Sequence, residues 1–114
     1  TWVHEEDEDW HKGAQALRNW YAYFYAWFKN DQVPVDGFIN PLTDTQMDEL
    51  PGFGLDDLHK NLLIGTPSEV TKRIKHYESL GVTQFSFWSD NGLPHSEKKK
   101  SLKLFIDKVM PNFN

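Results

Sequence analysis

The strongest constraint on the fold is the order of helix start and stop signals after residue 61. Thr66-Pro67-Ser68-Glu69 has the spacing of a capping box with proline at the first helical position, which predicts that a helix begins at residue 67. Gly81 can adopt a positive φ and is expected to end this helix. Apolar residues at helical spacing predict a buried stripe of Val70, Ile74, Tyr77 and Leu80.

A strand and a second helix are expected to follow. Residues 82–88 are aromatic and rich in β-forming residues, which is typical of a buried parallel strand, and a short extended run at 62–64 precedes the first helix. The last helix is expected to end at Pro111 and to bury Leu102, Phe105, Ile106 and Val109. This alternation of strand and helix is typical of an α/β fold.

The first 29 residues predict the end of a strand followed by a long helix. Residues 1–3 are expected to be the strand end, and Glu6 or Asp7 is expected to cap the helix. Apolar residues recur at helical spacing over 10–28, and residues 19–28 are apolar on almost every side. Such a helix is normally buried. We therefore expect the rest of a larger fold, or a partner subunit, to cover it.

Proline and glycine interrupt residues 30–61 repeatedly. Thr43-Asp44-Thr45-Gln46 has capping-box spacing and predicts a short helix at about 43–50, and a further helical turn is expected at 55–60. A long irregular connection inside a compact domain is typical of a functional lid or of a disordered segment.

Composition excludes several kinds of site and partner. The chain has no cysteine, which excludes disulfides, thiolate metal sites and cysteine nucleophiles. A net charge of −5 argues against nucleic acid as a partner, because nucleic-acid binding depends on clustered cations. No apolar run is long enough for a membrane helix, so no membrane partner is expected. The lack of cysteine is compatible with a reducing compartment, and we expect a cytoplasmic location.

Residues 62–113 resemble the carboxyl-terminal end of the bacterial luciferase-like flavin monooxygenases. The capping box at Thr66, the Leu80-Gly81-Val82 entry into the expected strand and the stretch from Ser101 to Pro111 all match this family, and the last stretch is closest to the α subunit of bacterial luciferase. Residues 1–29 match more loosely. The resemblance implies a (β/α)8 barrel, which needs roughly 250 residues. We therefore expect this chain of 114 residues to be a carboxyl-terminal fragment.

The expected fold class is α/β, as the carboxyl-terminal part of such a barrel, with two to three short strands and three main helices. One partial barrel domain is expected over 1–114. Its parts are a strand end and long helix at 1–29, a loop or lid with a short helix at 30–61, and the last helix–strand–helix unit at 62–114.

The resemblance also implies a function and a cofactor. Members of the family use reduced FMN, or a deazaflavin, to activate oxygen or to move a hydride. The parent protein is therefore expected to be a monooxygenase that uses reduced FMN and O2 on a small organic substrate and is supplied by a separate flavin reductase. The family's flavin-phosphate residues lie mostly on earlier strands, so the fragment alone is expected to be inactive. It is expected to join the remainder of the barrel, or a second subunit as a homo-oligomer.

The candidate site residues follow the last expected strand. Trp88, Ser89, Asp90 and Asn91 would lie at the carboxyl end of that strand, where (β/α)8 barrels hold their active sites, and could wall the flavin or the substrate. The alternative is a hydrogen-bonded turn packed under a tryptophan. His95 is a candidate for proton transfer because its unperturbed pKa is near 6.5, and a surface or capping role is the alternative.

No metal site is predicted. His4 and His11 flank an acidic run, but the run lacks the His-Glu-x-x-His spacing of a zinc site and is expected to be a solvated helix start. A second functional hypothesis stays open on the sequence alone. It is a stand-alone α/β interaction module that binds a protein partner through its aromatic helix.

Overall fold

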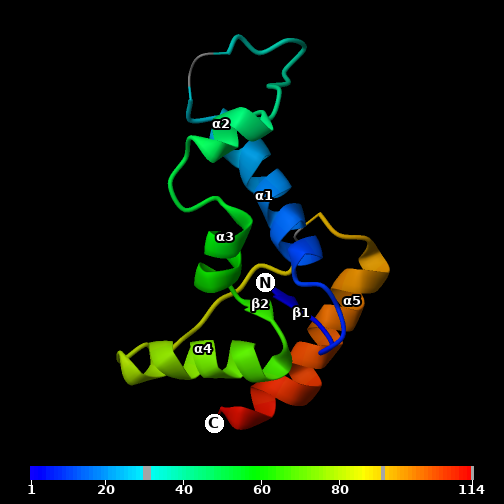
Figure 1. The fold of residues 1–114 in the computed structure, drawn as a ribbon, viewed down its shortest axis with the longest axis vertical. Helices are drawn as coiled ribbons and strands as arrows, with labels where there is room; N and C mark the ends of the chain where they lie inside the picture. The colour runs from blue at the N-terminus through cyan, green and yellow to red at the C-terminus, as the bar shows by residue number, and fades with distance from the viewer. Residues whose placement is uncertain (30–31, 91, 114) are drawn as a thin grey trace.

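The computed structural model describes residues 1–29, 32–90 and 92–113. In chain order, as labelled in Figure 1, the elements are β1 (Trp2–Val3), α1 (His11–Ala26), α2 (Asp44–Asp48), α3 (Leu55–Asn61), β2 (Ile64–Gly65), α4 (Pro67–Ser79) and α5 (His95–Leu104). The last helix continues through a π turn at Phe105–Val109 and a 3-10 turn at Met110–Asn112.

The two strands pair in parallel, with Trp2 opposite Ile64. The Trp2 amide donates to the Leu63 carbonyl at 2.8 Å, and the His4 amide donates to the Gly65 carbonyl at 3.1 Å. The predicted strand end at 1–3 is therefore confirmed as Trp2–Val3. The predicted extended run at 62–64 is confirmed at Ile64, because β2 begins two residues and ends one residue later than expected. Helices combined with two parallel strands are compatible with part of an α/β fold.

Both faces of this small sheet are covered. On one face Trp2 and Ile64 pack against residues of α1 and α3. On the other face Val3 packs against Val70 and Ile74 of α4 and against the end of the last helix at Phe105 and Val109. In a (β/α)8 barrel the helices form an outer ring and cover only the outer face of the sheet. Because helices cover both faces of this sheet, the structure does not show a barrel, and the barrel stays a prediction for this chain.

Residues 82–88 form no strand, contrary to the prediction, and the segment is exposed as it passes behind the sheet in the view of Figure 1. Side chains already occupy the two outer edges of the sheet. The Arg73 guanidinium donates to the Leu62 carbonyl and, at 3.1 Å, to the Ile64 carbonyl, both of which face away from β1. The Val3 amide donates to the Ser101 hydroxyl at 2.7 Å. A third strand beside β2 would have to displace Arg73.

The start of α4 is as predicted. The Thr66 hydroxyl accepts the Glu69 amide at 3.4 Å, and the Glu69 carboxylate accepts the Thr66 amide at 2.8 Å. Gly81 follows the helix with φ of 89°. Val70 and Ile74 are buried and Tyr77 is half-buried, but Leu80 is 67% exposed, so the buried stripe ends one turn early. The capping box of Thr43 and Gln46 and the helical turn at 55–60 are also confirmed.

Two details of the other helices differ from the predictions. The helix α1 begins at His11 rather than at the acidic run, and the carboxylate of Asp9, not Glu6 or Asp7, accepts the His11 amide at 3.0 Å. In the last helix Phe105 and Val109 are buried as predicted, whereas the other two predicted core residues face solvent, Leu102 at 39% and Ile106 at 49% exposed. The helix contacts the sheet along a narrower stripe than its sequence indicates.

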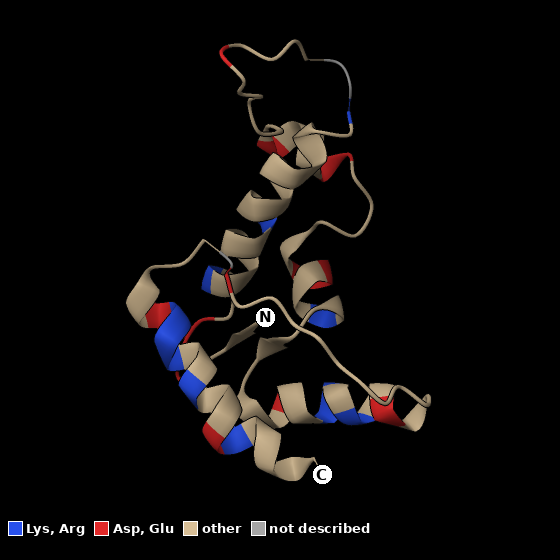
Figure 2. Ribbon diagram, turned by 180° about the vertical axis from the view of Figure 1, so that it is seen from behind, with Lys and Arg blue, Asp and Glu red and all other residues tan. Residues whose placement is uncertain are grey.

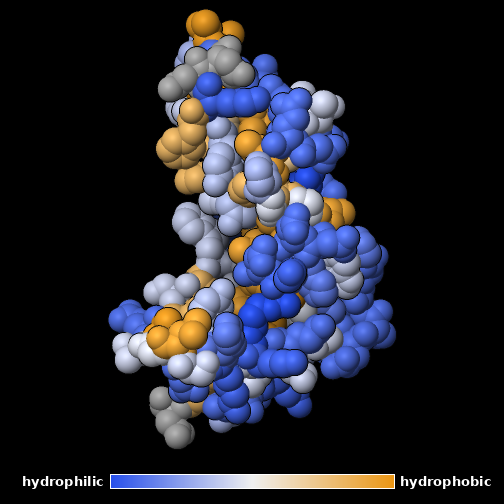
Figure 3. All heavy atoms as spheres, turned by 60° about the vertical axis from the view of Figure 1, so that its left-hand side comes forward, coloured by the Kyte–Doolittle hydropathy of each residue, from blue (hydrophilic) through white to orange (hydrophobic). Residues whose placement is uncertain are grey.

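The second half of α1 carries no charge and is covered on one side only. Its alanines, Ala22 and Ala26, pack against Leu42 and Met47 of the following segment. The opposite side exposes Tyr23 and Phe24, and the turn directly after α1 exposes Trp27 and Phe28. Charged residues gather instead on α4 and α5 (Figure 2), and hydrophobic side chains reach the surface in the view of Figure 3. As expected, the described part of the chain does not bury its aromatic helix.

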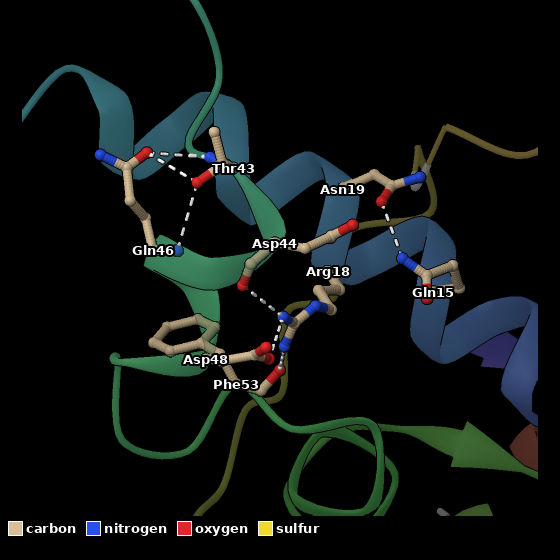
Figure 4. A network of polar contacts seen from close by, with 8 residues as sticks. All are labelled: Gln15, Arg18, Asn19, Thr43, Asp44, Gln46, Asp48 and Phe53. Carbon is tan, nitrogen blue, oxygen red and sulfur yellow. Dashed lines mark hydrogen bonds and ion pairs between the residues drawn. The ribbon is translucent and has the colours of Figure 1, made fainter.

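Arg18 holds the segment that contains α2 and the turn before α3 against α1 (Figure 4). Its buried guanidinium donates to the carbonyls of Phe53 at 2.5 Å and Asp44 at 3.2 Å, and to the carboxylate of Asp48 at 2.6 Å. One side chain therefore fastens both α2 and the turn before α3. The role of this segment as a lid stays a prediction.

Candidate functional site beside residues 85–90

A cavity of about 320 Å³ lies between α1, residues 61–63 before β2, the end of α4 and residues 85–90. The surface in Figure 3 is hollowed between its upper and lower parts. Most of the wall is aromatic, and the rings are Trp20, Tyr21, Tyr77, Phe85, Phe87 and Trp88. Polar lining is sparse and includes Asn61, Ser86 and Asp90. Mostly apolar pockets with a few polar groups are typical of small-molecule sites.

Two of the predicted site residues line this cavity. Trp88 is 66% exposed, and its ring lies 5.6 Å from that of Trp20, centroid to centroid, at 52°. The Trp88 carbonyl accepts the Thr1 nitrogen at 2.9 Å. The Asp90 carboxylate pairs with the Lys98 ammonium at 2.7 Å, and this hydrogen bond lowers the pKa of Asp90 below its usual value. Asp90 is therefore ionised at neutral pH.

The other predicted residues lie elsewhere or outside the description. Ser89 is exposed and borders a shallow hollow next to the cavity, together with Trp88 and Asp90. His95 is exposed at the first residue of α5 and does not line the cavity. Asn91 lies outside the described residues. The structure thus brings Trp88, Ser89 and Asp90 together and leaves His95 apart.

The charge of the cavity wall does not suit a phosphate group. Among the described lining residues none is Lys, Arg or His, and one is acidic, Asp90. The nitrogen of Thr1 also borders the cavity. Phosphate sites in proteins rely on cationic side chains or helix amino termini. These residues could face an aromatic ring, but the described lining residues offer no cationic side chain to a phosphate group.

A second cluster lies at the carboxyl ends of β1 and β2. His4 was expected in a solvated run, but it is only 4% exposed, because it continues β1 and packs on the Trp2 ring at 4.8 Å. Its Nδ1 lies 2.6 Å from the Glu5 carbonyl, and its Nε2 has no hydrogen-bond partner in the described protein. The sequence did contain a signal for this burial. Side chains alternate between the two faces of a strand, so His4, two residues after Trp2, is expected on the same face as Trp2.

His59 belongs to the same region. It stacks on Trp10 at 4.2 Å, and its Nε2 also lacks a partner among the described residues. Burial is the largest cause that lowers the pKa of His59, and it outweighs the nearby Glu69 carboxylate, which raises it. The described residues contain no group of three or more His, Asp or Glu that could hold a metal ion. None of their helices is long and apolar enough to cross a membrane.

The whole chain is similar to a curated protein. It is 39% identical over 114 residues to the oxygenase component of flavin-dependent trigonelline monooxygenase from Acinetobacter baylyi. The match covers 100% of this chain and 32% of that protein, so the chain spans about a third of the length of the curated relative it matches. No protein-family model matches the chain, and no solved structure matches it.

Proposed function

We propose that this chain is part of the oxygenase component of a flavin-dependent monooxygenase. The observation that carries the proposal is the 39% identity to such a component, which extends over all 114 residues rather than over one motif. Parallel strands joined through helices, with a cavity beside the segment that follows α4, are compatible with this assignment.

The finer features of the proposal come from the resemblance to the luciferase-like family. They are a (β/α)8 barrel, reduced FMN as the cofactor with a deazaflavin as the alternative, O2 as the second substrate, and a small organic molecule as the first. The relative is named as an oxygenase component, which supports a separate flavin reductase as a partner. The flavin would supply the oxygen chemistry. The residues of this chain would contribute one wall of the site.

Trp88, Ser89 and Asp90 are the residues that we propose face the substrate or the flavin ring, with Asn91 beside them in sequence. The cavity wall supports this role through its aromatic character and its single carboxylate. Because the wall offers no phosphate site, residues outside this chain would have to hold the flavin phosphate. The isolated chain is accordingly expected to be inactive.

The exposed aromatic side of α1 favours a second candidate, a module that binds a protein through this helix. Tyr23 and Trp27 are each about 60% exposed, and contiguous apolar surface of this kind commonly marks an interface. We propose that the chain pairs with a second copy or with the remainder of the barrel near Trp20, Tyr23, Phe24 and Trp27. A compact monomer of 13.4 kDa by light scattering, with Trp20 and Trp27 both quenched, would contradict the pairing.

Flavin binding separates the two candidates. The protein from the complete reading frame and the 114-residue chain would each be titrated with oxidised and reduced FMN, followed by flavin fluorescence. We expect the complete protein to bind reduced FMN and the chain alone to bind neither form tightly. A complex of micromolar or lower Kd with the chain alone would contradict the assignment of the phosphate site to residues outside it.

A further inference from the structure

We propose that His59 is an acid-sensitive latch, and that its protonation releases α3 from the start of α1 and from the sheet. His59 lies in the last turn of α3, and residues 61–63, which begin two positions later, line the cavity. Release of α3 would therefore open one wall of the cavity. That consequence for catalysis rests on the proposed function, whereas the latch itself does not.

His59 joins α3 to α1 through a stack of three rings. Its imidazole lies 4.2 Å from the Trp10 indole at 9°, and the His11 imidazole lies 3.8 Å from the same indole at 19°. Two rings at these distances and angles cannot share one face, so the indole lies between the two imidazoles. Trp10 packs against the core cluster that contains Leu58 of α3. The stack therefore sits where α3, the start of α1 and the sheet meet.

The Nε2 atom of His59 is buried and has no hydrogen-bond partner among the described residues. A neutral imidazole carries a proton on one of its two nitrogens, whereas an imidazolium carries a proton on both. The cation would therefore always place a charged N–H group at Nε2, where no described acceptor meets it and water has little access. Burial of an unpaired charge is strongly unfavourable in a folded protein. Protonation of His59 consequently favours a form in which this atom is released.

The charged groups around His59 come from three elements and have opposite effects. Burial is the largest cause of the change in the pKa of His59, and it lowers this pKa. Among the neighbours, Glu69 of α4 and Asp56 of α3 raise it. Arg73 of α4 and His4 of β1 lower it. The net effect holds the pKa of His59 below its usual value of 6.5, so the folded form binds the proton less readily than a form in which α3 is released.

This difference fixes the direction of the latch. A basic group whose pKa is lower in the folded form stabilises that form fully above a pH of about 6.5, and the stabilisation is lost as the pH falls. At pH 5.5, a histidine whose pKa returns to about 6.5 in the released form can favour release by at most about elevenfold. Acid should therefore make the opening of α3 more frequent by a factor within that limit.

Two features oppose the release. Leu58 is 3% exposed in the core, so α3 opens infrequently, and acid changes how often it opens rather than unfolding it outright. The face of the Trp10 ring also attracts an imidazolium. His11 already lies on the other face of that ring and pairs with Asp9 at 2.6 Å, so a protonated His59 meets a like charge across the ring whenever His11 is protonated. This repulsion limits the attraction of the ring for a second cation.

Hydrogen exchange followed by NMR tests the latch on the 114-residue chain. The amides of Leu58 and Leu62 donate to the carbonyls of Gly54 and Leu58, so their protection factors report the closure of α3, and the amide of Val70 reports the closure of α4. We expect the protection factors in α3 to fall roughly three- to tenfold between pH 7.5 and pH 5.5, while that of Val70 falls less. A fall of less than threefold in α3, or an equal or larger fall at Val70, would overturn the proposal.

Two variants assign the effect to His59. His59→Phe keeps a flat ring beside Trp10 but cannot be protonated, and His59→Gln, the second variant, keeps a polar side chain. Each is expected to remove the pH dependence of protection in α3. His76→Gln is the matched control and should retain the dependence, because His76 is exposed on α4. A dependence that persists in either His59 variant that folds, or that disappears in His76→Gln, would overturn the assignment. Because the measurement needs no flavin, its failure leaves the proposed function standing.

Discussion

Gly13 offers a prediction in which two physical effects have opposite signs. It is the third residue of α1, and a Cβ atom built there would lie 2.1 Å from Cε3 and 2.7 Å from Cδ2 of Trp2. Non-bonded contacts of a Cβ atom essentially never fall below 3.0 Å, so the ring or the helix would have to shift. Trp2 is 1% exposed and lies in the core, so its ring has little room to move.

The magnitudes decide the sign of Gly13→Ala. Alanine favours a helix over glycine by up to about 1 kcal/mol, which alone would stabilise the protein. Overpacking a filled core typically costs 1–3 kcal/mol, and the two contacts here suggest the upper half of that range. We therefore expect a net loss of about 1–2 kcal/mol in the free energy of unfolding. Urea unfolding followed by circular dichroism measures it, with the slope compared between variants.

A change at Trp2 should reverse the effect. Trp2→Val removes the ring atoms that the new Cβ would meet, at a cost of its own of roughly 3 kcal/mol from the lost core volume. In the Trp2→Val background, Gly13→Ala is expected to stabilise by about 0.5–1 kcal/mol, as helix propensity alone predicts. If Gly13→Ala stabilises the chain with Trp2 in place, or if the cycle shows no coupling, the packing of β1 against α1 described here is wrong.

Three further predictions concern caps and the Arg18 contacts. Thr66→Ala should lower the free energy of unfolding by ~1 kcal/mol through loss of the cap of α4, whereas Ser79→Ala at the exposed end should lower it much less. Equal losses in urea melts would show that the helix does not start where described. Glu69 has a pKa lowered from 4.5, chiefly by the Thr66 amide, so Glu69→Gln should destabilise at pH 7 and the difference should vanish as pH falls below the lowered value; a pH-independent difference would contradict this. Arg18→Ala should lower the free energy of unfolding by about 3 kcal/mol, because two charge-assisted hydrogen bonds to carbonyls are lost. Asp48→Asn should lower it by under ~1 kcal/mol, because the Asp48 side chain is exposed. Similar losses for the two variants in thermal melts would contradict the network.

Local chemistry allowed the starts of α2 and α4, though not that of α1, to be predicted from the sequence. The caps at Thr43 and Thr66 are set by residues three apart, and positive φ at Gly81 depends on one residue, so neither needs tertiary information. The two short strands were also predictable, because apolar extended runs flank the helices.

Long-range effects account for what the sequence did not predict. Residues 82–88 have strand composition, but a strand needs a neighbour, and Arg73 occupies the carbonyl edge of β2 where this segment would pair. The burial of His4 and the close approach of Gly13 to Trp2 arise from contacts between elements that are adjacent only in space.

The candidate site could be predicted only in part, because some of its residues meet through contacts between elements that are distant in the sequence. Trp88 and Asp90 were identified from their position after an expected strand, and they do line a cavity. Trp20 and Tyr21 were identified only as members of an apolar helix, because nothing in their spacing indicates that residues 85–90 lie beside them. His95 is a candidate from its residue type alone, and its place at the exposed start of α5 depends on tertiary packing that its sequence position does not indicate.

The most direct test of the central claim is isotope incorporation by the protein from the complete reading frame. That protein would be supplied with a flavin reductase, FMN, a reduced nicotinamide and ¹⁸O2, and a panel of small aromatic substrates would be examined by mass spectrometry. The assignment as part of a flavin-dependent monooxygenase predicts a product with one ¹⁸O atom, formed only when flavin is present. A protein that neither binds reduced flavin nor transfers ¹⁸O to any member of the panel would contradict it.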